Sequence, residues 1–95
     1  MVKKIRGKGK LFNEDGSVLI CDARYLIITH DDAQGMQYIE KATLDEITYN
    51  LLITLSEKLC VLLMDDGKRL DIQLMGLRGM PPDEIDFNII GGERI

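Results

Sequence analysis

Several residue types are scarce in this chain of 95 residues. It has no tryptophan, two phenylalanines, three tyrosines, two prolines, two cysteines and one histidine. A core must therefore be built mainly from aliphatic side chains. The few Cys and His residues do not form the closely spaced ligand clusters of structural zinc sites. We therefore expect no metal, and no motif indicates a small-molecule cofactor.

The two cysteines, Cys21 and Cys60, both lie in apolar runs. Two cysteines alone define no disulfide by their spacing, and buried cysteines often act as small apolar residues. We find no signal-peptide pattern, and no apolar run reaches the roughly 18 residues that cross a membrane. We expect two buried free thiols in a cytoplasmic protein, with a disulfide as the alternative.

Length and composition predict a single domain. Apolar residues make up 45% of the chain, close to the globular average. A chain of this length can build one core without metal or disulfide help, and it leaves no room for a second core. We predict one domain that spans residues 1–95.

The charge of the chain is unevenly distributed. The net charge is −4, yet five of the twelve basic residues and no acidic residue lie within the first ten positions. The acidic remainder repels phosphate backbones and favours solubility. The basic end can contact an acidic partner or the protein's own acidic surface.

Residues 3–12 alternate as a β-strand does. One face of this strand carries Ile5, Gly7, Gly9 and Leu11. The other face carries Arg6, Lys8, Lys10 and Phe12. Two glycines on one face favour close approach of another segment or a sharp bend, as at the corner of a barrel. The following sequence, NEDG, predicts a hairpin turn with Gly16 at positive φ.

Further strands follow along the chain. Residues 17–30 and 36–42 are predicted strands on either side of a polar loop at 30–35. The clearest element is a hairpin over 59–75, with an Asp-Gly turn and the inward residues Leu70, Ile72 and Leu74. Residues 76–84 are a predicted loop because Pro81 and Pro82 exclude regular pairing. The last predicted strand spans residues 85–90.

The segment 43–59, TLDEITYNLLITLSEKL, fits two patterns. Thr43 and Glu46 match a helix capping box, and the leucines keep helical spacing. Alternation of apolar and polar residues from Ile47 to Leu55 fits a strand, and the threonines and isoleucines favour it. We predict a strand, or a strand with a short turn, and leave a helix open.

Together these patterns predict a mainly β fold. Turn signals at intervals of roughly 10 to 20 residues are typical of small all-β domains. We expect a small single-domain barrel, or a strongly curled antiparallel sheet of five to six strands. One short helix around residues 43–58 is compatible with this architecture.

The run GKGKLFNEDG, residues 7–16, resembles the opening of cold-shock domains, small barrels of the OB type that bind single-stranded nucleic acid. The first strand of that family reads roughly Gly-Lys-Val-Lys-Trp-Phe-Asn. The matching residues are Gly7, Lys8, Lys10, Phe12 and Asn13. The resemblance covers about seven of the 95 residues, Leu11 replaces the stacking Trp, and the aromatic strands that follow in the family are absent. The resemblance implies binding of single-stranded nucleic acid, and the strand face that carries Arg6, Lys8, Lys10 and Phe12 would suit phosphates plus one stacked base.

Other motifs lack their structural context. Gly7 and Gly9 are not followed by the Gly-Lys-Ser/Thr of a P-loop or by the third glycine of a dinucleotide fingerprint. The acidic pairs 65–66 and 83–84 lack the EF-hand spacing and are predicted turn residues. His30 stands beside two aspartates without a second histidine or an assignable nucleophile. We therefore expect no catalytic activity.

Apolar side chains occupy both faces of residues 51–53 and 62–64. We interpret them mainly as core, with an interface to a partner or a second copy as the alternative. The sequence thus predicts a small, non-catalytic binding or interaction module. It would act through protein–protein contacts or self-association, by way of exposed strands or the loop around Pro81. The alternative is single-stranded nucleic-acid binding by Arg6, Lys8, Lys10 and Phe12.

Overall fold

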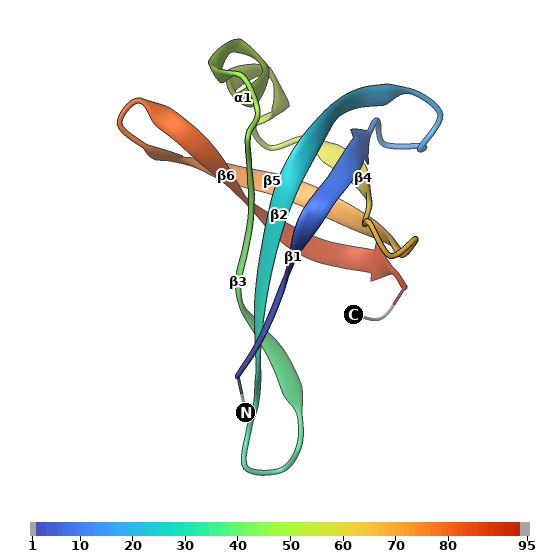
Figure 1. Cartoon of the computed structure of the whole chain (residues 1–95), viewed down its shortest axis with the longest axis vertical. Coiled ribbons are helices and arrows are strands. Elements are labelled where there is room, and N and C mark those ends of the chain that lie inside the picture. The colour runs from blue at the N-terminus through green and yellow to red at the C-terminus, as the bar shows by residue number, and fades with distance from the viewer. Residues whose placement is uncertain (1, 94–95) are drawn as a thin grey trace.

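A computed structural model describes residues 2–93 as one antiparallel barrel of six strands with one short helix (Figure 1). The elements in chain order are β1 (Val2–Phe12), β2 (Leu19–Asp31), β3 (Gln37–Asp45), α1 (Tyr49–Leu55), β4 (Leu59–Leu63), β5 (Arg69–Gly79) and β6 (Pro82–Gly92). The strand order around the closed sheet is β1-β2-β3-β6-β5-β4. The prediction of a mainly β barrel with five to six strands is confirmed.

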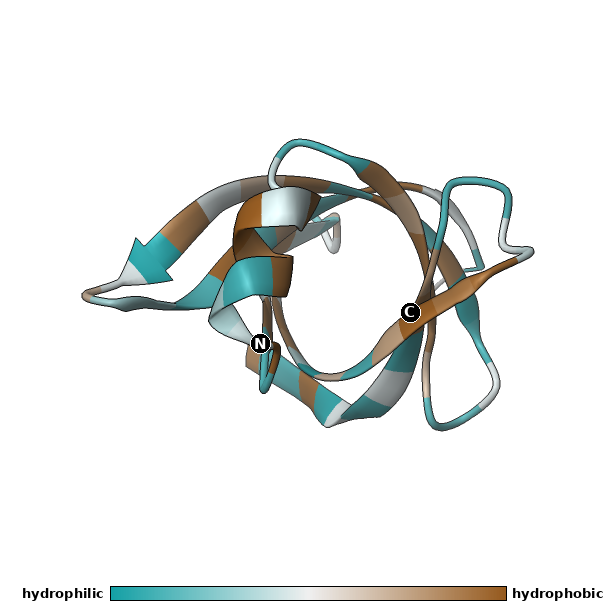
Figure 2. Cartoon of the chain, turned by 90° about the horizontal axis from the view of Figure 1, so that it is seen from above, coloured by the Kyte–Doolittle hydropathy of each residue, from teal (hydrophilic) through white to brown (hydrophobic). Residues whose placement is uncertain are grey.

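The barrel consists of two three-stranded sheets that meet at two short seams. At one seam Lys10–Phe12 of β1 pairs with Val61–Leu63 of β4. At the other, β3 and β6 share only the pairs Thr43–Asp86 and Leu44–Ile85. Away from the seams, β1, β2 and β3 continue together and protrude as a stalk at the bottom of Figure 1. Viewed from above, the strands form a ring, and α1 lies across one side of it (Figure 2).

The core lies inside this ring and is almost entirely aliphatic. Its fully buried members include Leu11, Ile27, Leu44, Leu62, Leu70, Ile72, Leu74 and Ile85. Each such side chain contributes roughly 1.5–3 kcal/mol by leaving water. The predicted inward faces of the first strand and of the 59–75 hairpin are confirmed. Tyr25 and Phe87 are the two buried aromatic residues in the part of the chain that the structure describes.

For residues 43–59 the preferred strand prediction is wrong beyond Asp45, and the alternative of one short helix is confirmed. β3 ends at Asp45, Glu46 adopts a positive φ of 59°, and α1 begins after Thr48. The helix buries Leu52 and Leu55, which are three residues apart and therefore share one helix face. A continued strand would leave Leu52 on its polar face. Burying these leucines at the end of the barrel therefore stabilises the helix by more than the β propensity of the isoleucines and threonines favours a strand.

The loop prediction for residues 76–84 is also wrong. β5 continues to Gly79, β6 begins at Pro82, and the two strands form a hairpin with Met80 and Pro81 at its tip. Proline is tolerated at the first position of a strand because the missing N–H costs no central ladder bond. Register shifts between Leu74 and Leu77 accommodate the irregular stretch.

Most of the apolar side chains in residues 51–53 and 62–64 are used by the chain itself. Leu52, Leu62 and Met64 are buried, whereas Ile53 on α1 is exposed. Both cysteines are free, Cys60 buried and Cys21 half-buried. Within residues 2–93, none of the helical structure is long and apolar enough to cross a membrane.

Candidate functional site

The two early glycines of β1 allow β4 and the turn after it to approach closely. A Cβ atom on Gly9 would lie 2.6 Å from the backbone oxygen of Leu63. A Cβ atom on Gly7 would overlap the Asp65 carboxylate and lie 2.6 Å from the Tyr25 hydroxyl. Gly7 and Gly9 therefore face inward as predicted, and their small size permits the seam between β1 and β4.

A hydrogen-bonded pair holds the β4–β5 turn against β1. The Tyr25 hydroxyl donates to Asp65 Oδ1 over 2.7 Å, and the Asp65 backbone N–H donates to the same hydroxyl over 3.3 Å. Burial, followed by the hydrogen bond to Asp65, raises the pKa of Tyr25 to about 12. The phenol therefore stays protonated at neutral pH and keeps donating to the carboxylate.

Two of the predicted binding residues are matched by the protein's own acidic surface. Lys8 Nζ lies 3.7 Å from Glu46, and Lys10 Nζ lies 3.2 Å from Asp22. Both lysines point away from the core and are exposed. Acidic residues of the same chain therefore partly balance these two charges. The protein's own acidic surface is one of the two contacts that the sequence predicts for the basic end.

The other two predicted residues, Arg6 and Phe12, lie far apart along the strand. Phe12 is half-buried at the seam with β4, next to an irregularity in the β1–β2 register. A half-buried ring offers little face for a stacked base. Arg6 instead lines a groove beside the first half of β1. The structure thus does not gather the four predicted residues into one site.

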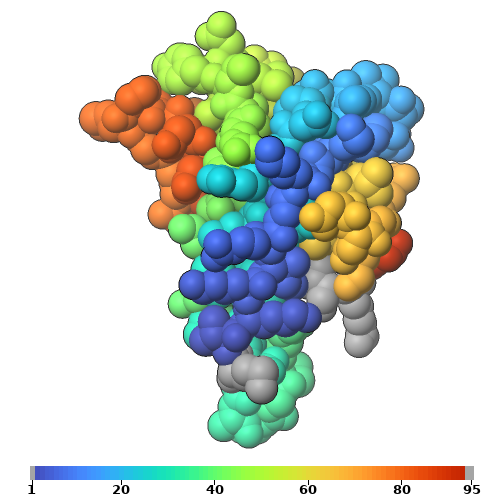
Figure 3. All heavy atoms as spheres, in the orientation of Figure 1, coloured from blue at the N-terminus to red at the C-terminus, as the bar shows by residue number. Residues whose placement is uncertain are grey.

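This basic groove lies between β1 and the β4–β5 turn and has a volume of about 390 Å³. The groove residues are Lys3, Lys4, Ile5, Arg6, Met64, Asp66 and Lys68. In Figure 3 the side chains of β1, in blue, lie directly beside those of the β4–β5 turn, in yellow and gold. Among residues 2–93, Asp66 is the one acidic lining residue, and it lies 3.9 Å from Lys68. The groove therefore carries an excess of positive charge.

The edge of β1 that faces the basic groove is open. β1 pairs with β2 along its whole length, from Val2 to Phe12. On its other side it pairs with β4 only from Lys10 to Phe12, and no other described strand pairs with it there. In a strand with one free edge, every second residue directs its N–H and C=O away from the sheet. β1 thus presents unpaired backbone groups from its first residues to the seam.

His30 lies near the end of β2 on the stalk, not in a loop, because β2 continues to Asp31. Its ring stacks on Tyr38 with 5.4 Å between centroids, and Nε2 lies 2.8 Å from Glu40 Oε2. Residues 2–93 contain no group of three His, Cys, Asp or Glu side chains that could hold a metal ion. Both cysteines lie on other parts of the barrel, near the β1–β4 seam. The stacking and the Glu40 contact orient the imidazole without placing a nucleophile beside it.

No sequence pattern groups Lys68 with Lys3, Lys4 and Arg6. Lys68 closes the Asp-Gly turn, which was correctly predicted as a turn. Its position next to β1 depends on the β1–β4 seam, which joins residues about fifty positions apart. The glycines on the inner face were the available signal, because they indicate that another segment approaches at that point.

Comparisons with protein-family models, with curated proteins and with solved structures find no match to this chain. The function must therefore be argued from the geometry and chemistry of the chain's own residues.

Proposed function

We propose that this protein is a non-catalytic interaction module that binds an extended acidic segment of a partner protein as an additional strand on β1. The observation that carries this proposal is the open edge of β1 beside a groove rich in positive charge. In strand addition, backbone hydrogen bonds supply much of the affinity, and alternate side chains supply the specificity.

The charges on β1 favour an acidic partner over a second copy of the chain. β1 contains five basic residues and no acidic residue. Pairing this edge with the same edge of a second copy would bring like charges together across the new ladder, which is destabilising. Basic side chains on an exposed edge are a known protection against such self-pairing. An acidic strand meets the same lysines as counter-charges.

The two faces of β1 predict the pattern of the bound segment. Lys4 and Arg6 point outward, so every second residue of the partner strand should be Asp or Glu. Ile5 points toward the core side, near Met64, so the intervening residues should be apolar. An alternating acidic and apolar sequence therefore satisfies both faces at once.

Single-stranded nucleic acid is the alternative occupant because its phosphates are also negative. The ion pairs of Lys8 and Lys10 and the half-buried ring of Phe12 weigh against it. Stacking on an aromatic face is worth roughly 1–3 kcal/mol per base, and this surface offers little of it. The acidic body of the chain adds repulsion.

Fluorescence anisotropy with three labelled probes separates these possibilities. The probes are a peptide of four Val-Glu repeats, a peptide of four Val-Lys repeats, and an oligothymidine of eight nucleotides. We expect the Val-Glu peptide to bind best, with an affinity that falls as salt is added. Tighter binding of the oligothymidine would favour the nucleic-acid alternative, and no binding of the Val-Glu peptide would overturn the proposal.

Two double variants that each remove two positive charges show which part of β1 contacts the Val-Glu peptide. The double variant Lys4→Gln with Arg6→Gln should weaken binding of the Val-Glu peptide at least tenfold. The double variant Lys8→Gln with Lys10→Gln removes the same charge from the seam end of β1, outside the basic groove, and should weaken binding less than threefold. Equal losses in the two variants would indicate diffuse attraction to the whole strand. Amide hydrogen exchange provides a second measurement, since added strand pairing should protect alternate amides between Lys3 and Gly7.

A further inference from the structure

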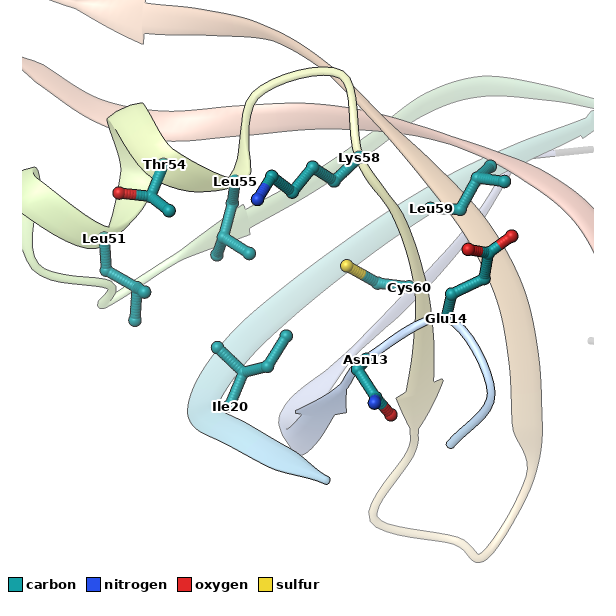
Figure 4. A pocket seen from close by; sticks show the side chains of 9 residues that line it. All are labelled: Asn13, Glu14, Ile20, Leu51, Thr54, Leu55, Lys58, Leu59 and Cys60. Atoms are coloured by element: carbon teal, nitrogen blue, oxygen red, sulfur yellow. The ribbon is translucent and has the colours of Figure 1, made fainter. Parts of the chain in front are cut away.

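A second hollow, distinct from the basic groove, lies where α1 meets the barrel. It has a volume of about 430 Å³, within the range of about 300–1,000 Å³ that is typical of small-molecule sites. Its walls come from α1, from the start of β4, from β2 and from the β1–β2 turn. Figure 4 shows the lining side chains converging from these separate elements. We refer to it as the apolar pocket.

The inner surface of the apolar pocket is hydrophobic. Ile20, Leu51, Leu55 and Leu59 supply the aliphatic walls, and the Cys60 side chain projects inward between them. Cys60 is buried, and this burial raises the pKa of its thiol to about 11. The thiol is therefore neutral at physiological pH, so it forms part of the apolar lining.

The uncharged polar groups of the apolar pocket are already engaged. The Asn13 side chain accepts hydrogen bonds from the backbone N–H groups of Ser17 and Val18, and its amide donates to the Ser17 hydroxyl. The Thr54 hydroxyl donates to the backbone oxygen of Asn50 over 3.0 Å. A ligand therefore gains little by hydrogen bonding to either side chain, and specificity depends on the charged residues at the rim.

Two residues of opposite charge, Lys58 and Glu14, line the apolar pocket. Within residues 2–93, neither forms an ion pair with another side chain. The backbone of Lys58 is held on both sides: its N–H donates to Leu55 over 3.1 Å, and its carbonyl accepts from the Leu74 N–H over 2.9 Å. In Figure 4 the Lys58 side chain extends toward α1, whereas the Glu14 carboxylate lies on the side of Leu59.

Glu14 and Lys58 are both exposed, so both charges reach water. In Figure 4 the Lys58 side chain points toward Leu55 and α1, so its aliphatic stem borders the apolar lining, whereas the Glu14 carboxylate lies away from α1. Of the two charges, the ammonium is therefore the one directed toward the aliphatic wall formed by α1. It can pair with an anionic group whose apolar remainder fills the pocket.

We propose that the apolar pocket binds a small amphipathic acid, with its alkyl chain among Ile20, Leu51, Leu55 and Leu59 and its carboxylate paired with Lys58. The alkyl chain displaces water from the aliphatic walls, and the single cation determines which head group is accepted. This inference is independent of the proposed strand addition, because the two sites share no residue.

Three ligands of equal chain length test the proposal: octanoate, 1-octanol and octylammonium. Binding is measured by two-dimensional ¹H–¹⁵N NMR titration, with the amides of Leu51, Thr54 and Cys60 as reporters. We expect octanoate to bind a few-fold more tightly than 1-octanol, because an ion pair with an exposed lysine is partly solvated, and octylammonium to bind most weakly. Equal affinities, a preference for octylammonium, or shifts confined to other parts of the barrel would each overturn the proposal.

Charge-neutral variants at the two rim residues form a matched pair. Lys58→Met should reduce the affinity for octanoate to that for 1-octanol, while Glu14→Gln should leave it unchanged or raise it. A third variant, Thr54→Phe, places a ring in the hollow from an exposed position of α1 and should weaken octanoate and 1-octanol alike. If Lys58→Met retains the preference for octanoate, the proposed carboxylate contact is wrong.

Discussion

The two halves of β1 have similar sequences and different surroundings. From Lys8 to Phe12 the strand is next to β4, its lysines form ion pairs, and Leu11 is fully buried. From Val2 to Gly7 it is paired on one edge only, and its basic side chains face a groove. Basic residues alternate with small or apolar ones from Lys4 to Leu11, so the pattern crosses both halves. The neighbouring strands therefore decide which half serves stability and which half is available for binding.

The largest expected change in stability comes from truncating an inward residue of β1, and comparing one such residue from each half tests the difference between the halves. Leu11→Ala should lower the free energy of unfolding by about 3–4 kcal/mol, because it leaves a cavity in a fully buried site. Ile5→Ala, in the half-buried first half, should cost less than about 2 kcal/mol. Urea denaturation measures both values. Equal losses would show that the two halves contribute equally to the core.

The seam itself is tested by Gly9→Val, for which we expect a loss of about 2–3 kcal/mol. The new side chain meets the backbone oxygen of Leu63, which cannot move without opening the β1–β4 ladder. Gly76→Ala is the control, since a Cβ atom there has nothing within 4 Å. A Gly9→Val variant as stable as the control would mean that the seam is not closely packed.

The connection between β2 and the basic groove is tested by Tyr25→Phe. Removing the hydroxyl leaves Asp65 without its buried partner and should cost about 1–2 kcal/mol at neutral pH. The turn that carries Lys68 loses its anchor, so the Val-Glu peptide should bind more weakly as well. Unchanged stability and unchanged peptide binding would show that this hydrogen bond does not position the turn.

The same variant has a distinct pH dependence. The pKa of Tyr25 rises from 10.0 to about 12 on folding, so the folded state retains a proton that the unfolded state releases. The resulting stabilisation is complete below pH 10 and is lost as the pH rises through about 12. The difference in stability between the original protein and Tyr25→Phe should therefore narrow over this range. Urea titrations at several alkaline pH values, together with tyrosinate absorbance, measure it.

The smallest expected effect concerns the exposed ion pair between Lys10 and Asp22. Lys10→Gln should change the free energy of unfolding by less than about 0.5 kcal/mol, because exposed pairs are well solvated. It should also leave octanoate binding unchanged, since Lys10 lines neither the apolar pocket nor the basic groove. A loss above 1 kcal/mol would assign this lysine a structural role that its exposure does not indicate.

Much of the fold could be predicted because its signals are local. The alternation of residue types along β1 correctly predicted that Gly9 and Leu11 face inward. The Asp-Gly turn correctly predicted the hairpin that carries Leu70. The errors arose where tertiary packing outweighed local preference. Leu52 covers the end of the barrel from a helix, although its neighbours favour a strand. The β5–β6 hairpin continues to Pro82 because an end position tolerates proline.

The candidate site was less predictable, since the sequence pattern selected Arg6, Lys8, Lys10 and Phe12 as one face. That face exists, but Glu46 and Asp22 neutralise its middle, and a register shift separates Phe12 from it. Glu46 is far from β1 in the sequence, and Asp22 lies opposite Lys10 only in this register of the β1–β2 hairpin. Pairings between residues this far apart depend on strand register, which a single sequence does not reveal.

The order of amino acids was sufficient to determine which side chains of β1, β5 and β6 face inward, because side chains in a strand alternate and the apolar ones are driven out of water. Closure of the barrel decided the rest. It left the first half of β1 with an open edge and brought Lys68 beside it. It also formed an open apolar pocket between α1 and the barrel. These features depend on contacts between distant segments, and such contacts form only when the whole chain packs together.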